Sequence, residues 1–259
     1  MAEQPLHPLV LIPGLMCDAT VWNAQIAALS DLAAVQVADH GLHDSLGAMA
    51  EAILRKAPMR FAVAGHSMGG RVALELMRRA PWRISGLALL DTSYVPLASG
   101  PAGERERQER AKLLELAQQQ GMRAVGERWL RIPMVHPDRF GDRELIERIL
   151  GMIERRTPEQ FAAQVRALLQ RPDARELLGT ITCPTLILCG REDAWALAAA
   201  HREMAALIPG STLVSIPHCG HMSTLERPTP VNEALRAWLL EVIARAAGAP
   251  RAAARPRRR

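Results

Sequence analysis

The chain has 259 residues, 49% of them hydrophobic and 3% aromatic, which suits one large domain, or a core with an insertion, packed mainly with aliphatic side chains. Its formal charge of +5 comes from the five arginines between Arg251 and Arg259, because the rest of the chain holds 27 basic and 27 acidic residues. This distribution does not indicate a nucleic-acid-binding module, and we expect residues 248–259 to form a basic, disordered tail.

The sequence also argues against a membrane protein, a secreted protein and a metalloprotein. No apolar run approaches the ~18–20 residues of a membrane span, and the first residues lack the basic and apolar regions of a secretory signal. We therefore expect a cytoplasmic protein that binds no membrane. The cysteines form no C-x-x-C pair and their spacing suits neither zinc nor a disulfide framework, so reduced thiols and no metal are expected. They are Cys17, Cys183, Cys189 and Cys219.

Short aliphatic runs alternate with helical patterns along most of the chain. The runs are apolar throughout, which is typical of strands buried on both faces of a parallel sheet. The predicted strands are Pro8–Ile12, Ala34–Ala38, Arg60–Ala64, Ile84–Leu90, Pro184–Cys189 and Thr212–Ile216. The predicted helices are Val21–Leu29, Ser45–Lys56, Gly69–Ala80, Ala194–Leu207 and Thr229–Ala246. This alternation predicts an α/β fold with a doubly wound, mostly parallel sheet of about six strands.

Residues 97–180 interrupt this rhythm because they contain no convincing strand and are rich in Arg, Glu, Gln and Leu. Turn-like Gly100-Pro101 and Ile132-Pro133 punctuate them. Helical patterns cover Glu104–Gln120, Met122–Leu130, Asp142–Arg155 and Pro158–Gln170. We predict a helical insertion at 97–180, which divides a core made of residues 1–96 and 181–247.

The most informative motif is Gly65-His66-Ser67-Met68-Gly69, between a predicted strand and a predicted helix. In this setting G-x-S-x-G is typical of a nucleophile elbow, a strained turn that projects the serine hydroxyl clear of the sheet. The glycines are required because strand and helix pass closely there. A glycine-rich turn with an inert serine would show the same local pattern. We expect the ring of His66 to pack beside the site rather than act as a base.

A nucleophilic serine needs a general base, and the base needs a carboxylate to orient it. Two later positions supply these groups in the order acid, then histidine. Asp193 follows the strand that ends near Cys189, and His221 follows the last predicted strand. Asp91, at the end of another predicted strand, is the alternative acid.

Together these motifs resemble the α/β-hydrolase superfamily, from about residue 8 to residue 240. The likeness is specific at Pro13-Gly14, at the elbow, at the Gly-x-x-Asp that ends at Asp193, and at Gly220-His221. It implies Ser67 as nucleophile, Asp193 as acid, His221 as base, and a helical lid at 97–180, between strands six and seven of the family fold. The family's N-terminal hairpin has no room before residue 13, so we expect a shortened sheet of six main strands.

The resemblance also implies an oxyanion hole, in which backbone N–H groups point at the developing negative oxygen. One donor is the N–H of Met68, the residue after the nucleophile. The other is the N–H of Leu15, with Met16 as an alternative. Where the family usually has His-Gly, this chain has Pro13-Gly14, a change that a backbone donor tolerates.

The resemblance predicts a serine hydrolase that cleaves a carboxylic ester, or a related lactone or thioester, through an acyl-enzyme on Ser67 and without a cofactor. The chain is also similar to carrier-protein methyl-ester esterases and enol-lactone hydrolases, so the small acyl substrate is either free or carried by a protein. Predicted substrate-binding residues are Tyr94, Trp129, Met134 and Trp195. Arginines of the insertion that are candidates to meet a charged partner are Arg123, Arg128 and Arg131.

Three other readings share this fold. A serine triad also supports carbon–carbon bond hydrolysis and cofactor-free perhydrolysis, and a receptor that binds a ligand with little turnover would keep the same pocket. Serine rather than aspartate at the elbow disfavours the dehalogenases and epoxide hydrolases of the superfamily.

Overall fold

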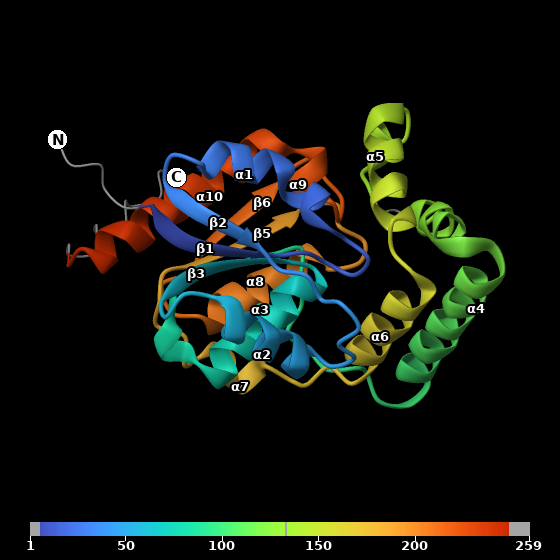
Figure 1. The fold of residues 1–259 in the computed structure, drawn as a ribbon, viewed down its shortest axis with the longest axis horizontal. Coiled ribbons are helices and arrows are strands. Elements are labelled where there is room, and N and C mark those ends of the chain that lie inside the picture. The colour runs from blue at the N-terminus through green and yellow to red at the C-terminus, as the bar shows by residue number, and fades with distance from the viewer. Residues whose placement is uncertain (1–5, 133, 249–259) are drawn as a thin grey trace.

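A computed structural model describes residues 6–132 and 134–248. Its centre is a six-stranded sheet in the order β2-β1-β3-β4-β5-β6, and every neighbouring pair is parallel (Figure 1). The strands are β1 His7–Ile12, β2 Ala33–Val37, β3 Phe61–His66, β4 Ile84–Leu90, β5 Thr185–Gly190 and β6 Thr212–Ile216. The predicted α/β fold with about six parallel strands is confirmed. The strand predicted to end at Ala64 instead continues to His66 in β3, so it reaches the elbow directly.

The aliphatic composition of the strands follows from their burial. Every residue of β3, β4 and β5 is buried, whereas the edge strands β2 and β6 are partly exposed. Successive side chains point to opposite faces of a sheet, so one strand contributes to two cores. Leu9 and Leu11 of β1 join one cluster, and Val10 and Ile12 join the other.

Helices cover both faces of the sheet. Figure 1 shows α1, α9 and α10 on one face and α2, α3, α7 and α8 on the other. Their bounds are α1 Asn23–Leu29, α2 Leu46–Lys56, α3 Met68–Arg79, α7 Arg175–Leu178, α8 Ala198–Leu207, α9 Ser223–Glu226 and α10 Pro228–Ala246. Short 3₁₀ turns are η1 Ala19–Trp22, η2 Pro81–Arg83 and η3 Pro137–Arg139. Within the described residues, no helix combines the length and apolar character needed to cross a membrane.

One predicted helix starts later than expected. The sequence predicts a helix from Ala194, but α8 begins at Ala198. The reason is that the side chain of Asp193 accepts hydrogen bonds from the N–H groups of Trp195 and Ala196, which holds these residues in a turn.

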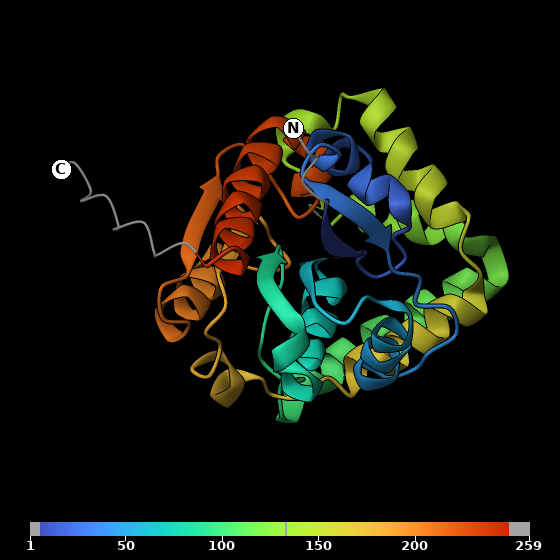
Figure 2. The same cartoon turned by 60° about the vertical axis from the view of Figure 1, so that its left-hand side comes forward.

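The segment between β4 and β5 contains three longer helices, α4 Gly100–Leu130, α5 Arg143–Glu154 and α6 Pro158–Leu169. The break predicted inside the first of them is present as a kink at Gly121, whose φ is 82°. Figure 1 shows the three helices grouped on one side of the sheet, and Figure 2 shows the group turned partly behind it. The role of 97–180 as a lid stays a prediction. Residues 249–259 of the predicted tail lie outside the described residues.

Candidate active site

The Gly65–Gly69 turn joins β3 directly to α3, with Ser67 at its apex. Ser67 has φ 54° and ψ −118°, a left-handed conformation that is costly for any residue other than glycine. A Cβ on Gly65 would lie 2.3 Å from the carbonyl oxygen of Gly69, and one on Gly69 would lie 2.1 Å from that of Ile12. The close approach of backbone segments therefore excludes any side chain at either glycine, and it holds Ser67 in its strained turn.

The structure brings Ser67, His221 and Asp193 together in one chain of hydrogen bonds. The Ser67 hydroxyl lies 2.9 Å from Nε2 of His221, and Nδ1 of His221 lies 2.8 Å from Oδ2 of Asp193. Oδ1 of Asp193 accepts hydrogen bonds from Trp195 N–H at 2.7 Å and Ala196 N–H at 2.9 Å. With its Nδ1–H donated to the carboxylate, the imidazole leaves Nε2 free to accept the serine proton.

Charge reinforces this arrangement. Burial alone lowers the pKa of His221, but the negative charge of Asp193 and its hydrogen bond outweigh burial and raise that pKa above its ordinary value. Burial alone raises the pKa of Asp193, but the charge and hydrogen bond of His221, with two backbone N–H donors, bring it below its ordinary value. The pair therefore favours an ionised carboxylate beside a histidine of increased basicity.

Asp91, the alternative acid, occupies a different place. It is fully buried at the end of β4, where Oδ1 accepts the Gly190 N–H at 2.9 Å and Oδ2 accepts the Ser223 hydroxyl. Its Oδ2 lies 3.7 Å from Nε2 of His66 rather than against the ring of His221. Burial, and then the charge of Asp193, raise the pKa of Asp91 well above its ordinary value. The residue that bonds the ring of His221 is therefore Asp193 and not Asp91.

His66 lies beside the triad, as the sequence indicated. Its Nε2 lies 2.9 Å from the carbonyl oxygen of His221, and its ring centroid is 5.4 Å from that of His221. Burial, with the nearby His221, lowers the pKa of His66 to about 4. A neutral His66 whose Nε2–H donates to that carbonyl braces the backbone of His221.

The two predicted oxyanion donors have free N–H groups. Met68 is the first residue of α3, Leu15 lies in the loop after β1, and neither N–H makes a hydrogen bond within the described residues. The alternative donor, Met16, gives its N–H to Oε1 of Gln164 on α6 at 2.9 Å. Backbone N–H groups at the start of a helix favour a negative charge, so the Met68 position suits an oxyanion.

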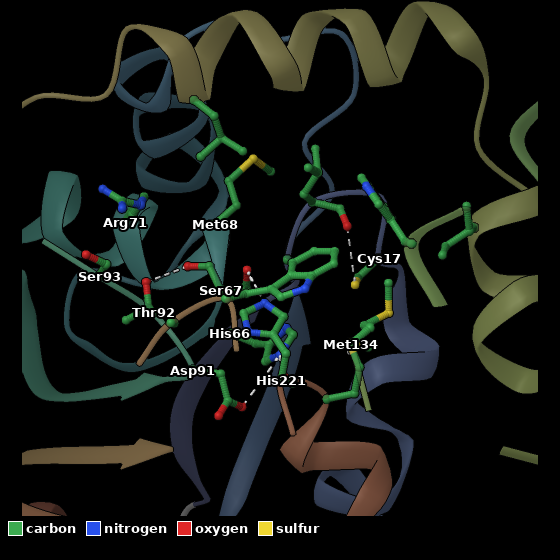
Figure 3. A pocket seen from close by; sticks show the side chains of 18 of the residues that line it. Cys17, His66, Ser67, Met68, Arg71, Asp91, Thr92, Ser93, Met134 and His221 are labelled. Atoms are coloured by element: carbon green, nitrogen blue, oxygen red, sulfur yellow. Dashed lines mark hydrogen bonds and ion pairs between the residues drawn. The ribbon is translucent and has the colours of Figure 1, made fainter. Parts of the chain in front are cut away.

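A cavity of about 390 Å³ opens above Ser67, as Figure 3 shows. Trp129, Met134 and Trp195 line it, as the sequence predicted. The centroid of the Trp195 ring lies 5.1 Å from that of the His221 ring and 5.6 Å from that of the Trp129 ring. Aromatic surface therefore lies against His221. The structure does not bring Tyr94 to this cavity, because the loop after β4 turns it inward and its hydroxyl donates to Glu203 at 3.0 Å.

Cys17 also lines the cavity, but burial raises the pKa of its thiol to about 12. A thiol in that state is not a nucleophile at neutral pH.

One charged part of the cavity wall was not predicted from the sequence. Arg71, Glu106, Arg110 and Arg171 line it, whereas Arg123, from the predicted set, pairs with Glu147 on the surface. One signal was available, because Arg71 follows Ser67 by four residues, about one helical turn. Glu106 and Arg110 are one turn apart on α4, and Arg171 joins them only in the fold.

Comparisons with known proteins identify the family of this chain. Residues 9–234 match the Alpha/beta hydrolase family. A curated relative, a pimeloyl-[acyl-carrier protein] methyl ester esterase of Nitrosomonas europaea, is 29% identical over 237 residues, covering 85% of this chain and 90% of the relative. A thermophilic esterase from Thermogutta terrifontis superposes with a TM-score of 0.79 at 31% identity, covering 91% of this chain and 90% of that one.

The enol-lactonase from Burkholderia xenovorans has a TM-score of 0.80 at 23% identity, covering 93% of this chain and 94% of its own, and this likeness supports the fold alone. The family match spans most of the chain, including the elbow and the loop that carries His221. The chain therefore belongs to the α/β-hydrolase family.

Proposed function

We propose that the protein is a carboxylic ester hydrolase that works through an acyl-enzyme on Ser67, with His221 as base and Asp193 as its orienting acid. The observation that carries the proposal is the unbroken hydrogen-bond chain from Ser67 through His221 to Asp193, beside a cavity that Ser67 and His221 line. Relatives named as a methyl ester esterase and a thermophilic esterase support the reaction class.

In this proposal the reaction has two stages, formation of the acyl-enzyme and its hydrolysis. Nε2 of His221 removes the hydroxyl proton of Ser67 as Oγ of Ser67 attacks the ester carbonyl carbon. The carbonyl oxygen becomes an oxyanion that faces the N–H groups of Leu15 and Met68. His221 then gives the proton to the leaving alcohol as the ester C–O bond breaks. Water attacks the acyl-enzyme, its proton passes to His221, and the acid leaves as Ser67 is reprotonated.

The substrate in this proposal is a small acyl compound. Lactones and thioesters present the same electrophilic carbonyl, and the name of the Nitrosomonas relative includes an acyl-carrier protein, so a carrier-bound acyl ester also falls within the proposal. Carbon–carbon hydrolysis and perhydrolysis would use the same three side chains and are separated from ester hydrolysis by substrate.

The test is hydrolysis of p-nitrophenyl esters from acetate to decanoate by wild type, by Ser67→Ala, and by Ser30→Ala as a matched control. Ser30 lies at the end of α1, where its hydroxyl donates to the Ala27 carbonyl. We expect Ser67→Ala to lower kcat by roughly 10⁴-fold or more and Ser30→Ala to retain wild-type turnover.

A fluorophosphonate probe supplies a second readout that needs no substrate. We expect it to label wild type and not Ser67→Ala. Ligand binding without labelling of the wild type would contradict the proposal and support the receptor reading.

A further inference from the structure

One end of the active-site cavity carries a cluster of charged side chains that the hydrolytic mechanism does not use. Three arginines, Arg71, Arg110 and Arg171, line this end together with one partly buried carboxylate, Glu106. Glu109 lies at the same end, but it is exposed and pairs with Lys112 at 2.7 Å. The partly buried part of the cluster therefore holds three positive charges against one negative charge.

Glu106 engages two of the three arginines. Arg171 donates two hydrogen bonds to it, one to each carboxylate oxygen, both at 2.7 Å, and Arg110 donates to Oε1 at 2.8 and 3.0 Å. These bonds, from arginines whose side chains are 9% and 20% exposed, lower the pKa of Glu106 to about 2 despite its partial burial. Glu106 is thus saturated with donors.

Arg71 has no carboxylate of its own. Its one hydrogen bond within the described residues is to the Val95 carbonyl oxygen at 2.8 Å, and no described carboxylate lies within ion-pair distance. Burial, and then the like charge of Arg171, lower the pKa of Arg71 to about 9, so it is still a cation at neutral pH. The buried Nε of Arg171 also lacks a partner among the described residues.

A partly buried guanidinium that pairs directly with no described carboxylate is costly, and a bound anion reduces that cost. A guanidinium fork also matches the two oxygens of a carboxylate. We propose that Arg71, supported by Arg110 and Arg171, forms a subsite for a carboxylate at the far end of the substrate's acyl group. This inference rests on the proposed function, since it names the class of ester: the monoester of a dicarboxylic acid.

The carboxylate is assigned to the acyl side for a geometric reason. The leaving alcohol must lie against Nε2 of His221, which protonates it. In Figure 3, Arg71 lies on the opposite side of Ser67 from His221, together with Ser93. Arg71 is four residues beyond Ser67, or roughly 6 Å along the helix axis, so a chain of several carbon atoms separates the ester from the carboxylate.

The test compares two methyl esters of the same acyl length, monomethyl adipate and methyl hexanoate, which differ by a terminal carboxylate. We expect wild type to show the higher kcat/KM for monomethyl adipate. Arg71→Gln should lower the ratio of the two kcat/KM values by about tenfold or more, chiefly through KM, and Arg71→Lys should give an intermediate ratio. Arg107→Gln is the matched control, because Arg107 lies on α4, is 52% exposed, and does not line the cavity.

Three outcomes would overturn the proposal. The first is that wild type hydrolyses methyl hexanoate through Ser67 but does not prefer monomethyl adipate. This result would contradict the carboxylate subsite and still support the proposed function. An equal loss on both esters in Arg71→Gln would assign Arg71 a general structural role. Faster hydrolysis of 6-acetoxyhexanoate than of monomethyl adipate would place the carboxylate on the alcohol side.

A binding measurement decides the subsite even if no ester is hydrolysed. By calorimetry, we expect adipate to bind Ser67→Ala and to bind the double variant Ser67→Ala, Arg71→Gln at least about tenfold more weakly. Inorganic phosphate that binds as tightly as adipate, with the same dependence on Arg71, would show a phosphate site and contradict the carboxylate assignment.

Discussion

Two buried carboxyl groups lie near the His221 imidazole, and their pKa values are shifted in opposite directions. Asp193 has its pKa lowered by His221 and two backbone N–H groups that offset the cost of burial. Asp91 has its pKa raised by burial and by the charge of Asp193. Separated pKa values of this kind assign different roles to two carboxyl groups in one site. The carboxylate of Asp193, which bonds Nδ1 of His221, therefore orients the ring.

The pH dependence of hydrolysis follows from the raised pKa of His221. The base must be neutral, so kcat/KM for an uncharged ester should fall as the pH drops through a midpoint above the ordinary histidine value of about 6.5. A pH profile from 5 to 9 measures this midpoint. A midpoint at or below that ordinary value would contradict the electrostatic account of the site.

Replacing each carboxyl group by its amide separates their roles. Asp193→Asn should lower kcat by about 10⁴-fold, because the amide no longer holds the imidazole in the tautomer that accepts the serine proton. Asp91→Asn should cost less than about tenfold, since an amide oxygen also accepts from the Gly190 N–H and the amide group still bonds the Ser223 hydroxyl. Steady-state kinetics checks both, and equal losses would show that Asp91 is needed as much as Asp193, which contradicts the assignment.

At the scale of elements, the packing of β1, β3 and α3 holds Ser67 in place. Gly69→Ala should destabilise the protein by about 1–3 kcal/mol, because the new methyl group would meet the backbone carbonyl of Ile12, which cannot rotate away. Denaturant unfolding measures the change. Gly141→Ala is the control, since a Cβ at Gly141 meets nothing within 4 Å. Equal stabilities for the two variants would show that the elbow can relax.

At the scale of the whole molecule, α6 is tied to the loop that carries Leu15. The buried bond from the Met16 N–H to Gln164 joins residues 148 positions apart. Gln164→Leu leaves that N–H unpaired and should destabilise the protein by about 1–3 kcal/mol. We also expect kcat to fall by roughly tenfold, because the neighbouring Leu15 N–H loses its position. Thermal unfolding and kinetics would test both effects, with the exposed Gln170→Leu as control. Lower stability with unchanged kcat would show that the bond to α6 does not position the Leu15 N–H.

The sequence by itself determined the strands, most of the helices and the family. Strand and helix periodicities are local, so the runs at Pro8–Ile12 and Ile84–Leu90 were recognisable without any tertiary contact. The elbow was equally readable, because a turn so tight between strand and helix tolerates only glycine at Gly65 and Gly69. Gly121, too, marked the break in α4 in advance.

Only the tertiary structure decided which distant side chains meet. Asp91 and Asp193 both follow buried strands, and the bond to His221 distinguished them through the path of the loop after β5. The hydrogen bonds from the Trp195 and Ala196 N–H groups to Asp193 delayed the start of α8, a change that helix propensity does not predict. Arg71, Arg110 and Arg171 converge from separate segments on one end of the cavity. Such convergence depends on long-range packing, whereas sequence patterns report only on neighbours along the chain.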